Sequence, residues 1–238
     1  MKNILLLSFL LISSTSLANN KLIIGSDDRY PITEMNKNKA HESIGLLLIL
    51  SESGRLFTCT GTIIGTHHVL TAAHCLVDEN GREFSAVYFM PKVNQDLQKN
   101  PTSPFGIITA RSFKVLDEHL PSPSHTNDLG LVVFDEALPY SPLPISQALK
   151  DDKELTIAGY PGDKTYGTLW EAKGTISSII GGAHKVDTMA GQSGAAVRNS
   201  AGKIIGVHSG GISLLVFKRN LFLSFTKEHI DFLKREIE

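Results

Sequence analysis

The sequence lacks an excess of either charge and lacks segments of low complexity. Its 238 residues carry 23 Lys and Arg against 24 Asp and Glu, which gives a formal net charge of −1. Proteins that bind nucleic acid usually carry a clustered positive charge, so we expect no nucleic-acid partner. No long block of like charge is present to form a disordered interaction tail, and no internal repeat is found.

Apolar runs long enough to cross a membrane are also missing. The run Ile4–Ile12 is short, follows a basic start at Met1–Asn3, and precedes Ser16–Ala18, where small residues flank leucine. This pattern is typical of a secretory signal peptide, which we assign to residues 1–18. A retained N-terminal anchor is the alternative. We therefore expect a secreted protein, extracellular or periplasmic, with no membrane contact after the signal is removed.

Cysteine is scarce, with only Cys59 and Cys75 in the chain. A structural zinc site would need two more ligands at suitable spacing, and these are absent. In an oxidising compartment the two cysteines are expected to form a disulfide, worth roughly 3 kcal/mol through the loop that it closes. We expect neither a metal nor a cofactor.

Turn-forming residues are plentiful, because 20 glycines and 10 prolines separate many short apolar runs. Such spacing favours an all-β chain. The expected strands are residues 44–50, 57–64, 68–71, 84–90, 107–115 and 129–134, then 155–160, 170–178, 185–188, 195–198, 204–208 and 221–225.

Three prolines within Pro139–Pro144 cannot continue a sheet, so residues 139–144 are the expected linker between domains at 19–138 and 145–238. The last segment, residues 227–237, changes to a helical period. Its apolar residues Ile230, Leu233 and Ile237 share one face, and Thr226 is the expected N-cap.

The segment Met189–Ala195 places Ser193 between two glycines, on a turn where a hydroxyl can project. A serine hydroxyl becomes an effective nucleophile only when a base removes its proton. Candidate partners lie upstream: His74 in Thr71–Cys75 (Thr-Ala-Ala-His-Cys), and Asp128 at the start of the apolar run Asn127–Phe134. Each string alone has a structural explanation, but their order along the chain, His then Asp then Ser, is that of one catalytic arrangement.

With these three strings and Gly206–Gly211, the chain resembles the trypsin-like (chymotrypsin-fold) serine proteases, and among them the bacterial glutamyl endopeptidases. The resemblance implies two six-stranded antiparallel β-barrels with the active site between them, and a C-terminal helix packed on the second barrel. It also implies a disulfide beside the catalytic histidine, which suits Cys59 and Cys75. His74 and Asp128 fall in the first half and Ser193 in the second.

The resemblance implies that Ser193 attacks the substrate carbonyl, that His74 takes its proton, and that Asp128 orients the histidine. The backbone N–H groups of Gly191 and Ser193 would form the oxyanion hole. One departure is Gln192, which stands where many relatives carry an aspartate that binds a newly formed N-terminal amine. Because Gln192 is uncharged, it cannot form that salt bridge.

Substrate preference rests on Asp187, Thr188 and His208. By resemblance, Asp187 lies at the pocket floor, where trypsin-like members use an aspartate to select Arg or Lys. In glutamyl endopeptidases the residues matching Thr188 and His208 contact the substrate glutamate instead. A potentially cationic ring at His208 would attract a carboxylate, so we favour Glu over Arg or Lys at P1.

The sequence therefore predicts a secreted serine endopeptidase that acts on proteins or peptides through an acyl-enzyme, with a preference for Glu. We expect it to be a monomer. Two alternatives remain open: trypsin-like specificity for Arg or Lys, and a catalytically silent binding protein that keeps the protease fold.

Overall fold

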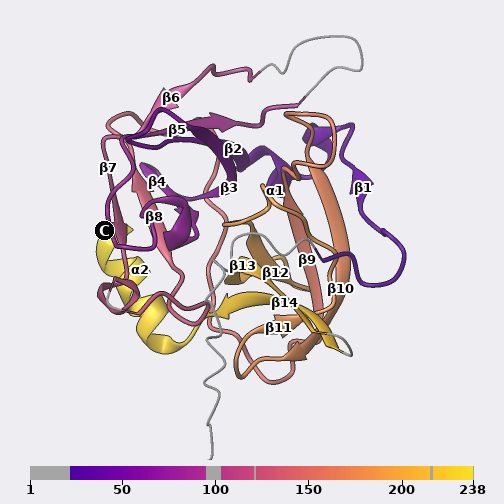
Figure 1. Ribbon diagram of the computed structural model, residues 1–238. Coiled ribbons are helices and arrows are strands. Elements are labelled where there is room, and N and C mark those ends of the chain that lie inside the picture. Colours follow the sequence, from indigo (N-terminus) through magenta and orange to yellow (C-terminus); the bar gives the residue numbers. More distant parts are fainter. Residues whose placement is uncertain (1–21, 95–102, 121, 215–216, 238) are drawn as a thin grey trace, which may run out of the picture.

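The computed structural model describes residues 22–94, 103–120, 122–214 and 217–237, which form two antiparallel sheets side by side (Figure 1). The signal peptide expected at residues 1–18 lies outside the described part of the chain. Within that part, no helix combines the length and the apolar character needed to span a bilayer.

The first sheet has the strand order β6-β5-β2-β3-β4-β8-β7. Its members are β2 (Ile44–Leu50), β3 (Leu56–Gly65), β4 (His68–Thr71), β5 (Ala86–Pro91), β6 (Ile108–Thr109), β7 (Ser112–Val115) and β8 (Gly130–Val133).

One strand predicted at residues 107–115 is broken in two in this sheet. At the break, the Ala110 N–H donates to Val87 O at 2.9 Å, whereas the Arg111 N–H donates to Val133 O at 2.8 Å. The backbone thus changes partner from β5 to β8, which closes the sheet into a barrel and explains why seven strands are present where six were expected.

The second sheet has the order β1-β10-β11-β14-β13-β12-β9. Its members are β1 (Tyr30–Pro31), β9 (Glu154–Gly159), β10 (Trp170–Ser178), β11 (Ala183–His184), β12 (Ala196–Asn199), β13 (Ile204–Leu214) and β14 (Phe217–Ser224). The strand predicted at residues 185–188 is not formed; β11 ends at His184 instead.

The second sheet also closes, because β9 pairs with β10 to complete a ring of six strands. Its seventh strand, β1, adds to the edge with Tyr30 opposite Glu171 and Pro31 opposite Trp170. The N-terminal segment, which the sequence division assigned to the first barrel, therefore pairs with the second. The all-β fold of two barrels with a C-terminal helix is confirmed.

Helices are few and mostly short: α1 (Lys39–Glu42), the 3-10 turns η2 (Met35–Lys37), η3 (Ala73–Cys75) and η4 (Asp117–His119), and the C-terminal α2 (Lys227–Ile237). At the start of α2 the Thr226 N–H donates to His229 Nδ1 at 3.1 Å, so a histidine accepts the bond that a capping glutamate usually accepts.

The helix α2 lies against the first sheet, and the position on the second barrel implied by the resemblance is wrong (Figure 1). Leu233 is fully buried in the apolar cluster that contains Val69 and Leu131 of the first sheet. Glu236 forms an ion pair with Lys114 of β7. The helix therefore packs on the first sheet, although it follows the last strand of the second.

A separate apolar cluster fills the space between the sheets. It joins Ile44 and Leu46 of β2 to Ala158 and Tyr160 of the second half. The Tyr160 hydroxyl donates to Val93 O at 2.9 Å within this interface. Because packed apolar interfaces resist deformation, this cluster holds the two barrels in one relative position.

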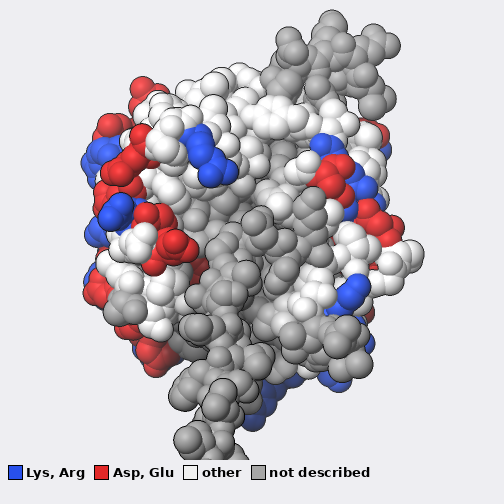
Figure 2. Space-filling model, viewed as in Figure 1, with Lys and Arg blue, Asp and Glu red and all other residues white. Residues whose placement is uncertain are grey.

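The charged side chains of the face seen in Figure 2 are mixed in sign. Acidic and basic groups occur together on both flanks of this face. This distribution agrees with the net charge of −1.

The structure joins Cys59 and Cys75 in a disulfide with a Cα–Cα distance of 6.3 Å. We predict that the purified exported protein shows no thiol that iodoacetamide can alkylate without reductant, as read by mass spectrometry. Replacing both cysteines by serine should lower the free energy of unfolding by roughly 3 kcal/mol. Two alkylated thiols in the unreduced protein would refute the bridge; the reduced and denatured sample is the positive control.

Candidate active site

His74 lies on the 3-10 turn that directly follows β4. Within this turn Ala73 and Cys75 are buried, whereas the His74 side chain keeps 28% of its surface exposed. The disulfide from Cys75 to Cys59 ties the turn to β3. The disulfide restrains the backbone of this turn, and the His74 ring remains partly exposed to solvent.

Asp128 holds His74 through two hydrogen bonds. The His74 backbone N–H donates to Asp128 Oδ1 at 2.9 Å, and His74 Nδ1 lies 2.7 Å from Oδ2. An ionised carboxylate can only accept, so Nδ1 carries the proton and Nε2 is left as the acceptor. This is the tautomer that a general base on the Nε2 side requires.

Ser209 is a third member of this group, and it had no role in the sequence-based prediction. Its hydroxyl donates to Asp128 Oδ2. The only sequence feature that could have pointed to Ser209 is its position directly after His208 in the motif Gly206–Gly211. A hydroxyl at one strand position gives no indication of a partner 81 residues away, so only the fold brings the two together.

The environment shifts the pKa values of both partners. Burial raises the pKa of Asp128, but the charge of His74 and the hydrogen bonds from His74 and Ser209 outweigh it and hold that pKa below 3.8. Burial lowers the pKa of His74, but the Asp128 charge and hydrogen bond outweigh it and raise the pKa above 6.5. Each group thus favours the charged form of the other.

The turn that carries Ser193 depends on its two glycines. Gly191 has φ +93° and Gly194 has φ +81°, in the region that favours glycine. A Cβ at Gly191 would stand 2.3 Å from Tyr160 O, and one at Gly194 would stand 2.0 Å from Thr71 Oγ1. Both glycines are therefore required by backbone conformation. They are also required by close neighbours, which are Tyr160 of the second half at Gly191 and Thr71 of the first sheet at Gly194.

Thr60 of β3 fastens this turn to the first sheet. Its N–H donates to Ser193 O at 2.8 Å, and its hydroxyl donates to Gly191 O at 2.9 Å. The Thr71 hydroxyl in turn donates to Thr60 O at 3.0 Å. The sequence analysis assigned no role to either threonine, because threonine is common in β-strands and its presence there indicates no particular contact.

Two backbone N–H groups of the turn are left unused. The described residues offer no hydrogen-bond acceptor to the N–H of Gly191 or of Ser193. The Gly162 N–H donates to Ala190 O at 2.7 Å. In a trans peptide the C=O and N–H point in opposite directions, so this bond turns the Gly191 N–H away from Gly162. Unpaired N–H groups beside a serine hydroxyl are suited to stabilising an oxyanion.

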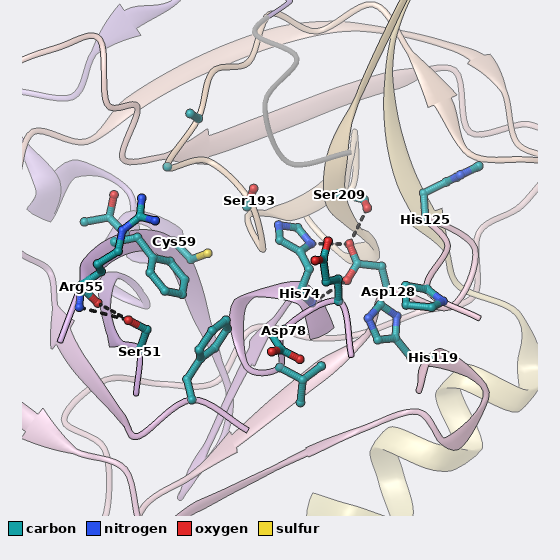
Figure 3. A pocket seen from close by; sticks show the side chains of 18 of the residues that line it. Ser51, Arg55, Cys59, His74, Asp78, His119, His125, Asp128, Ser193 and Ser209 are labelled. Atoms are coloured by element: carbon teal, nitrogen blue, oxygen red, sulfur yellow. Dashed lines mark hydrogen bonds and ion pairs between the residues drawn. The ribbon is translucent and has the colours of Figure 1, made fainter. Parts of the chain in front are cut away.

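An open cleft of about 770 Å³ brings the predicted catalytic residues together. His74, Asp128, Gly191 and Ser193 all line it. In Figure 3 the His74 ring stands between Ser193 on one side and Asp128 with Ser209 on the other. No hydrogen bond joins Ser193 Oγ to His74 among the described contacts, and such bonds often form fully only with substrate bound.

Asp187 does not present a free carboxylate as a pocket floor. It is 1% exposed, and its two oxygens accept the N–H groups of Ile24 at 2.7 Å and Asp28 at 3.1 Å. We expected Asp187 to contact a substrate side chain. In the structure both of its carboxylate oxygens instead accept N–H groups of the N-terminal segment. Burial, followed by the charge of Asp187, raises the pKa of Asp28.

Thr188 and His208 are both buried and are not among the described residues that line the cleft. Thr188 forms an isolated β-bridge with Leu22. The side-chain amide of Asn220 donates to Leu22 O at 3.0 Å and to Val186 O at 2.8 Å. Asn220 therefore connects the N-terminal segment to the strand-like residues before Thr188.

A second histidine, His184, contacts His208. The Val186 N–H donates to His184 Nδ1 at 3.2 Å, and His184 Nε2 lies 3.4 Å from His208 Nδ1. Nδ1 of His184 is thus an acceptor, its proton is on Nε2, and the proton of a neutral His208 is left on its own Nε2.

The charge expected on His208 is absent at neutral pH. Burial, then the charge of His74, lowers the pKa of His208 to about 4. The sequence suggested a cationic ring, but no carboxylate among the described residues contacts it to offset the loss of hydration. A backbone hydrogen bond with Leu221 and the charge of Asp128 oppose the lowering of the His208 pKa but do not outweigh it.

Cys59, His74 and Cys75 place one potential ligand atom each within 4.8 Å of one another. Metal binding by cysteine needs a thiolate, and both sulfurs are joined in the disulfide. This group therefore has no ligand set for a metal.

Comparison with known proteins gives a consistent match. The family model described as "Trypsin-like peptidase domain" matches residues 59–207. Glutamyl endopeptidase of Staphylococcus aureus strain MRSA252 is 28% identical over 231 residues, covering 91% of this chain and 59% of that protein. The enzyme of strain MW2 is 28% identical over 229 residues, covering 91% and 64%. The chain thus spans about three fifths of the length of these curated relatives.

Solved structures share the fold. A Glu endopeptidase structure in complex with MPD superposes with a TM-score of 0.76 at 21% identity, covering 91% of this chain and 99% of that one. The thermostable serine protease AL20 of an extremophilic microorganism gives 0.65 at 20% identity, covering 77% and 91%.

The His74–Asp128 pair has a titration signature. In ring NMR spectra of the wild type, we predict a His74 pKa above 6.5, the direction given by the Asp128 charge and hydrogen bond. Asp128→Asn removes that charge, so the pKa of His74 should fall and the neutral ring should persist to lower pH. Asp78→Asn is the matched control, because Asp78 lines the same cleft without contacting His74. An unchanged His74 titration in Asp128→Asn would contradict the pairing.

Proposed function

The chain belongs to the trypsin-like peptidase domain family, and on this premise we propose that it is a secreted serine endopeptidase that cleaves peptide bonds after glutamate. The observation that carries the proposal is the arrangement in one cleft of a serine, a histidine oriented by a buried aspartate, and two unpaired backbone N–H groups. The Cys59–Cys75 disulfide supports export, because disulfides persist in oxidising compartments.

In the proposed reaction Ser193 Oγ attacks the substrate carbonyl while His74 Nε2 accepts its proton. Asp128 keeps the proton of His74 on Nδ1 and stabilises the imidazolium as it forms. The N–H groups of Gly191 and Ser193 would donate to the carbonyl oxygen as it becomes an oxyanion. The imidazolium then protonates the leaving amine, and water releases the acyl group by the same steps in reverse.

The preference for glutamate has two supports. The relatives at 28% identity are named glutamyl endopeptidases. The contacts of His184 leave the proton of His208 on Nε2, and a substrate carboxylate that reached this buried ring would accept from it. Binding of a carboxylate there would raise the pKa of His208 and add charge to the contact.

Trypsin-like specificity has less support. An aspartate that selects Arg or Lys needs an unpaired carboxylate at the pocket, and Asp187 already accepts two backbone N–H groups. A catalytically silent binding protein would be indicated by replacement of a catalytic residue. Ser193, His74 and Asp128 are all present.

We predict that Ser193→Ala abolishes peptide hydrolysis but leaves the thermal unfolding temperature nearly unchanged, because it removes one half-buried oxygen. A fluorophosphonate probe should label the wild type at Ser193 alone, as read by peptide mapping. Ser51→Ala is the matched serine control, because Ser51 lines the same cleft and its hydroxyl bonds only Ser53 and Arg55 among the described residues; it should still be labelled at Ser193. Appreciable hydrolysis by Ser193→Ala would refute the catalytic assignment.

Specificity is tested with matched peptides that differ only in Glu, Gln or Arg at P1. We expect the wild type to cleave after Glu fastest. His208→Val should selectively reduce Glu cleavage, by about tenfold to hundredfold if one polar contact is lost. His208→Gln keeps a side-chain donor and should recover part of the loss.

Faster wild-type cleavage after Arg would overturn the glutamate preference and leave the nucleophile assignment intact. Faster Arg cleavage combined with an unchanged preference in His208→Val would point to Asp187 as the selecting residue.

A further inference from the structure

Arg29 is a buried cation close to the turn that carries Ser193. It belongs to the N-terminal segment directly before β1, and its side chain is fully buried. Its guanidinium binds Asp27 through Nε and Nη2, each at 2.8 Å. It binds Asp163 through Nη1 at 2.9 Å and Nη2 at 2.6 Å. A guanidinium is the side chain that can hold two carboxylates in this forked geometry.

The contact with Arg29 stabilises the ionised form of both carboxylates. The hydrogen bond from Arg29 lowers the pKa of Asp27 and of Asp163, and it outweighs their partial burial. Asp27 and Asp163 keep 32% and 26% of their side-chain surface exposed. Both could remain hydrated without Arg29, so loss of the arginine need not unfold the chain.

A first connection leads from Arg29 to the Gly191 peptide. Asp163 follows Gly162, whose N–H donates to Ala190 O at 2.7 Å. That bond sets the direction of the Gly191 N–H, since the two ends of a trans peptide point in opposite directions. By holding Asp163, Arg29 holds the loop that supplies this donor.

A second connection leads from Arg29 to Gln192. Arg29 Nη1 lies 3.5 Å from Gln192 Oε1, which also accepts the Met189 N–H at 2.9 Å. The Gln192 N–H donates back to Met189 O at 3.0 Å. Gln192 is fully buried, and its Nε2 has no hydrogen-bond partner among the described residues. The side chain that precedes Ser193 is thus held between its own turn and Arg29.

We propose that Arg29 is a positioning residue for the oxyanion hole, an inference that rests on the proposed peptidase function. Through Asp163 and Gln192 it fixes both sides of the Met189–Ser193 turn, so that the N–H groups of Gly191 and Ser193 face the substrate. Because Gln192 is uncharged, it forms no salt bridge with a terminal ammonium. Arg29, a cation from within the chain, contacts Gln192 instead.

Arg29→Met tests this role. We expect kcat to fall by about tenfold to hundredfold, up to the loss typical of one oxyanion donor, with KM little changed. Affinity for a peptide boronate, whose tetrahedral adduct uses the hole, should fall by a similar factor, whereas affinity for the product peptide should not. Arg29→Lys, which keeps the charge without the fork, should recover part of kcat.

Arg198→Met is the matched control. Arg198 is also buried and binds Glu171 at 2.8 Å, but it does not contact the Met189–Ser193 turn. It should lower stability without changing kcat of the folded protein. In 15N spectra the amide signals of Gly191 and Ser193 should shift in Arg29→Met and stay in place in Arg198→Met.

A double-mutant cycle isolates the contact with Gln192. Gln192→Ala and Arg29→Met each remove the contact between Nη1 and Oε1. If the two side chains act through that contact, the loss of kcat in the double variant should be smaller than the product of the single losses.

The outcomes separate the two proposals. A folded Arg29→Met with wild-type kcat, boronate affinity and amide signals would overturn the role of Arg29 and leave the peptidase function standing. A wild type that neither cleaves peptides nor binds the boronate would refute the peptidase function. The amide signals of Gly191 and Ser193 would still report whether Arg29 positions the turn.

Discussion

The hydrogen bonds from Thr60 to the Ser193 turn are the constraint on which the site depends. Thr60 belongs to β3 of the first sheet, and it binds the carbonyls of Gly191 and Ser193 on the second half. These bonds cross the boundary on which His74 and Ser193 face each other. These bonds require one relative position of the two barrels. The same position brings His74 and Ser193 together, so the packing of the barrels determines the geometry of the site.

Glycine makes that close approach possible. The space beside Gly194 is filled by Thr71 and Thr60, and the space beside Gly191 by Tyr160. A side chain at Gly194 would push the serine away from the first sheet, and one at Gly191 would collide with the Tyr160 backbone. The same two residues supply the positive φ values that the turn needs. Conformation and packing therefore demand glycine for separate reasons.

The N-terminal segment, residues 22–31, contacts several parts of the second half. Its backbone binds Asp187, its β1 extends the second sheet, and its Arg29 holds Asp163. One short stretch of chain therefore contacts Asp187, the second sheet and the loop that carries Asp163. In the proposed peptidase, the position of the Ser193 turn depends on how this stretch packs.

The sequence by itself determined the all-β class, most strand positions, the helix at residues 227–237 and the candidate residues His74, Asp128 and Ser193. These follow from local signals: alternating apolar runs, turn residues and short motifs. Only the tertiary structure decided that Ser209 binds Asp128, that Asp187 binds the N-terminal backbone, and that α2 packs on the first sheet. Those features depend on contacts between residues far apart in the chain, where burial and competing hydrogen bonds choose the partner and no local pattern encodes it.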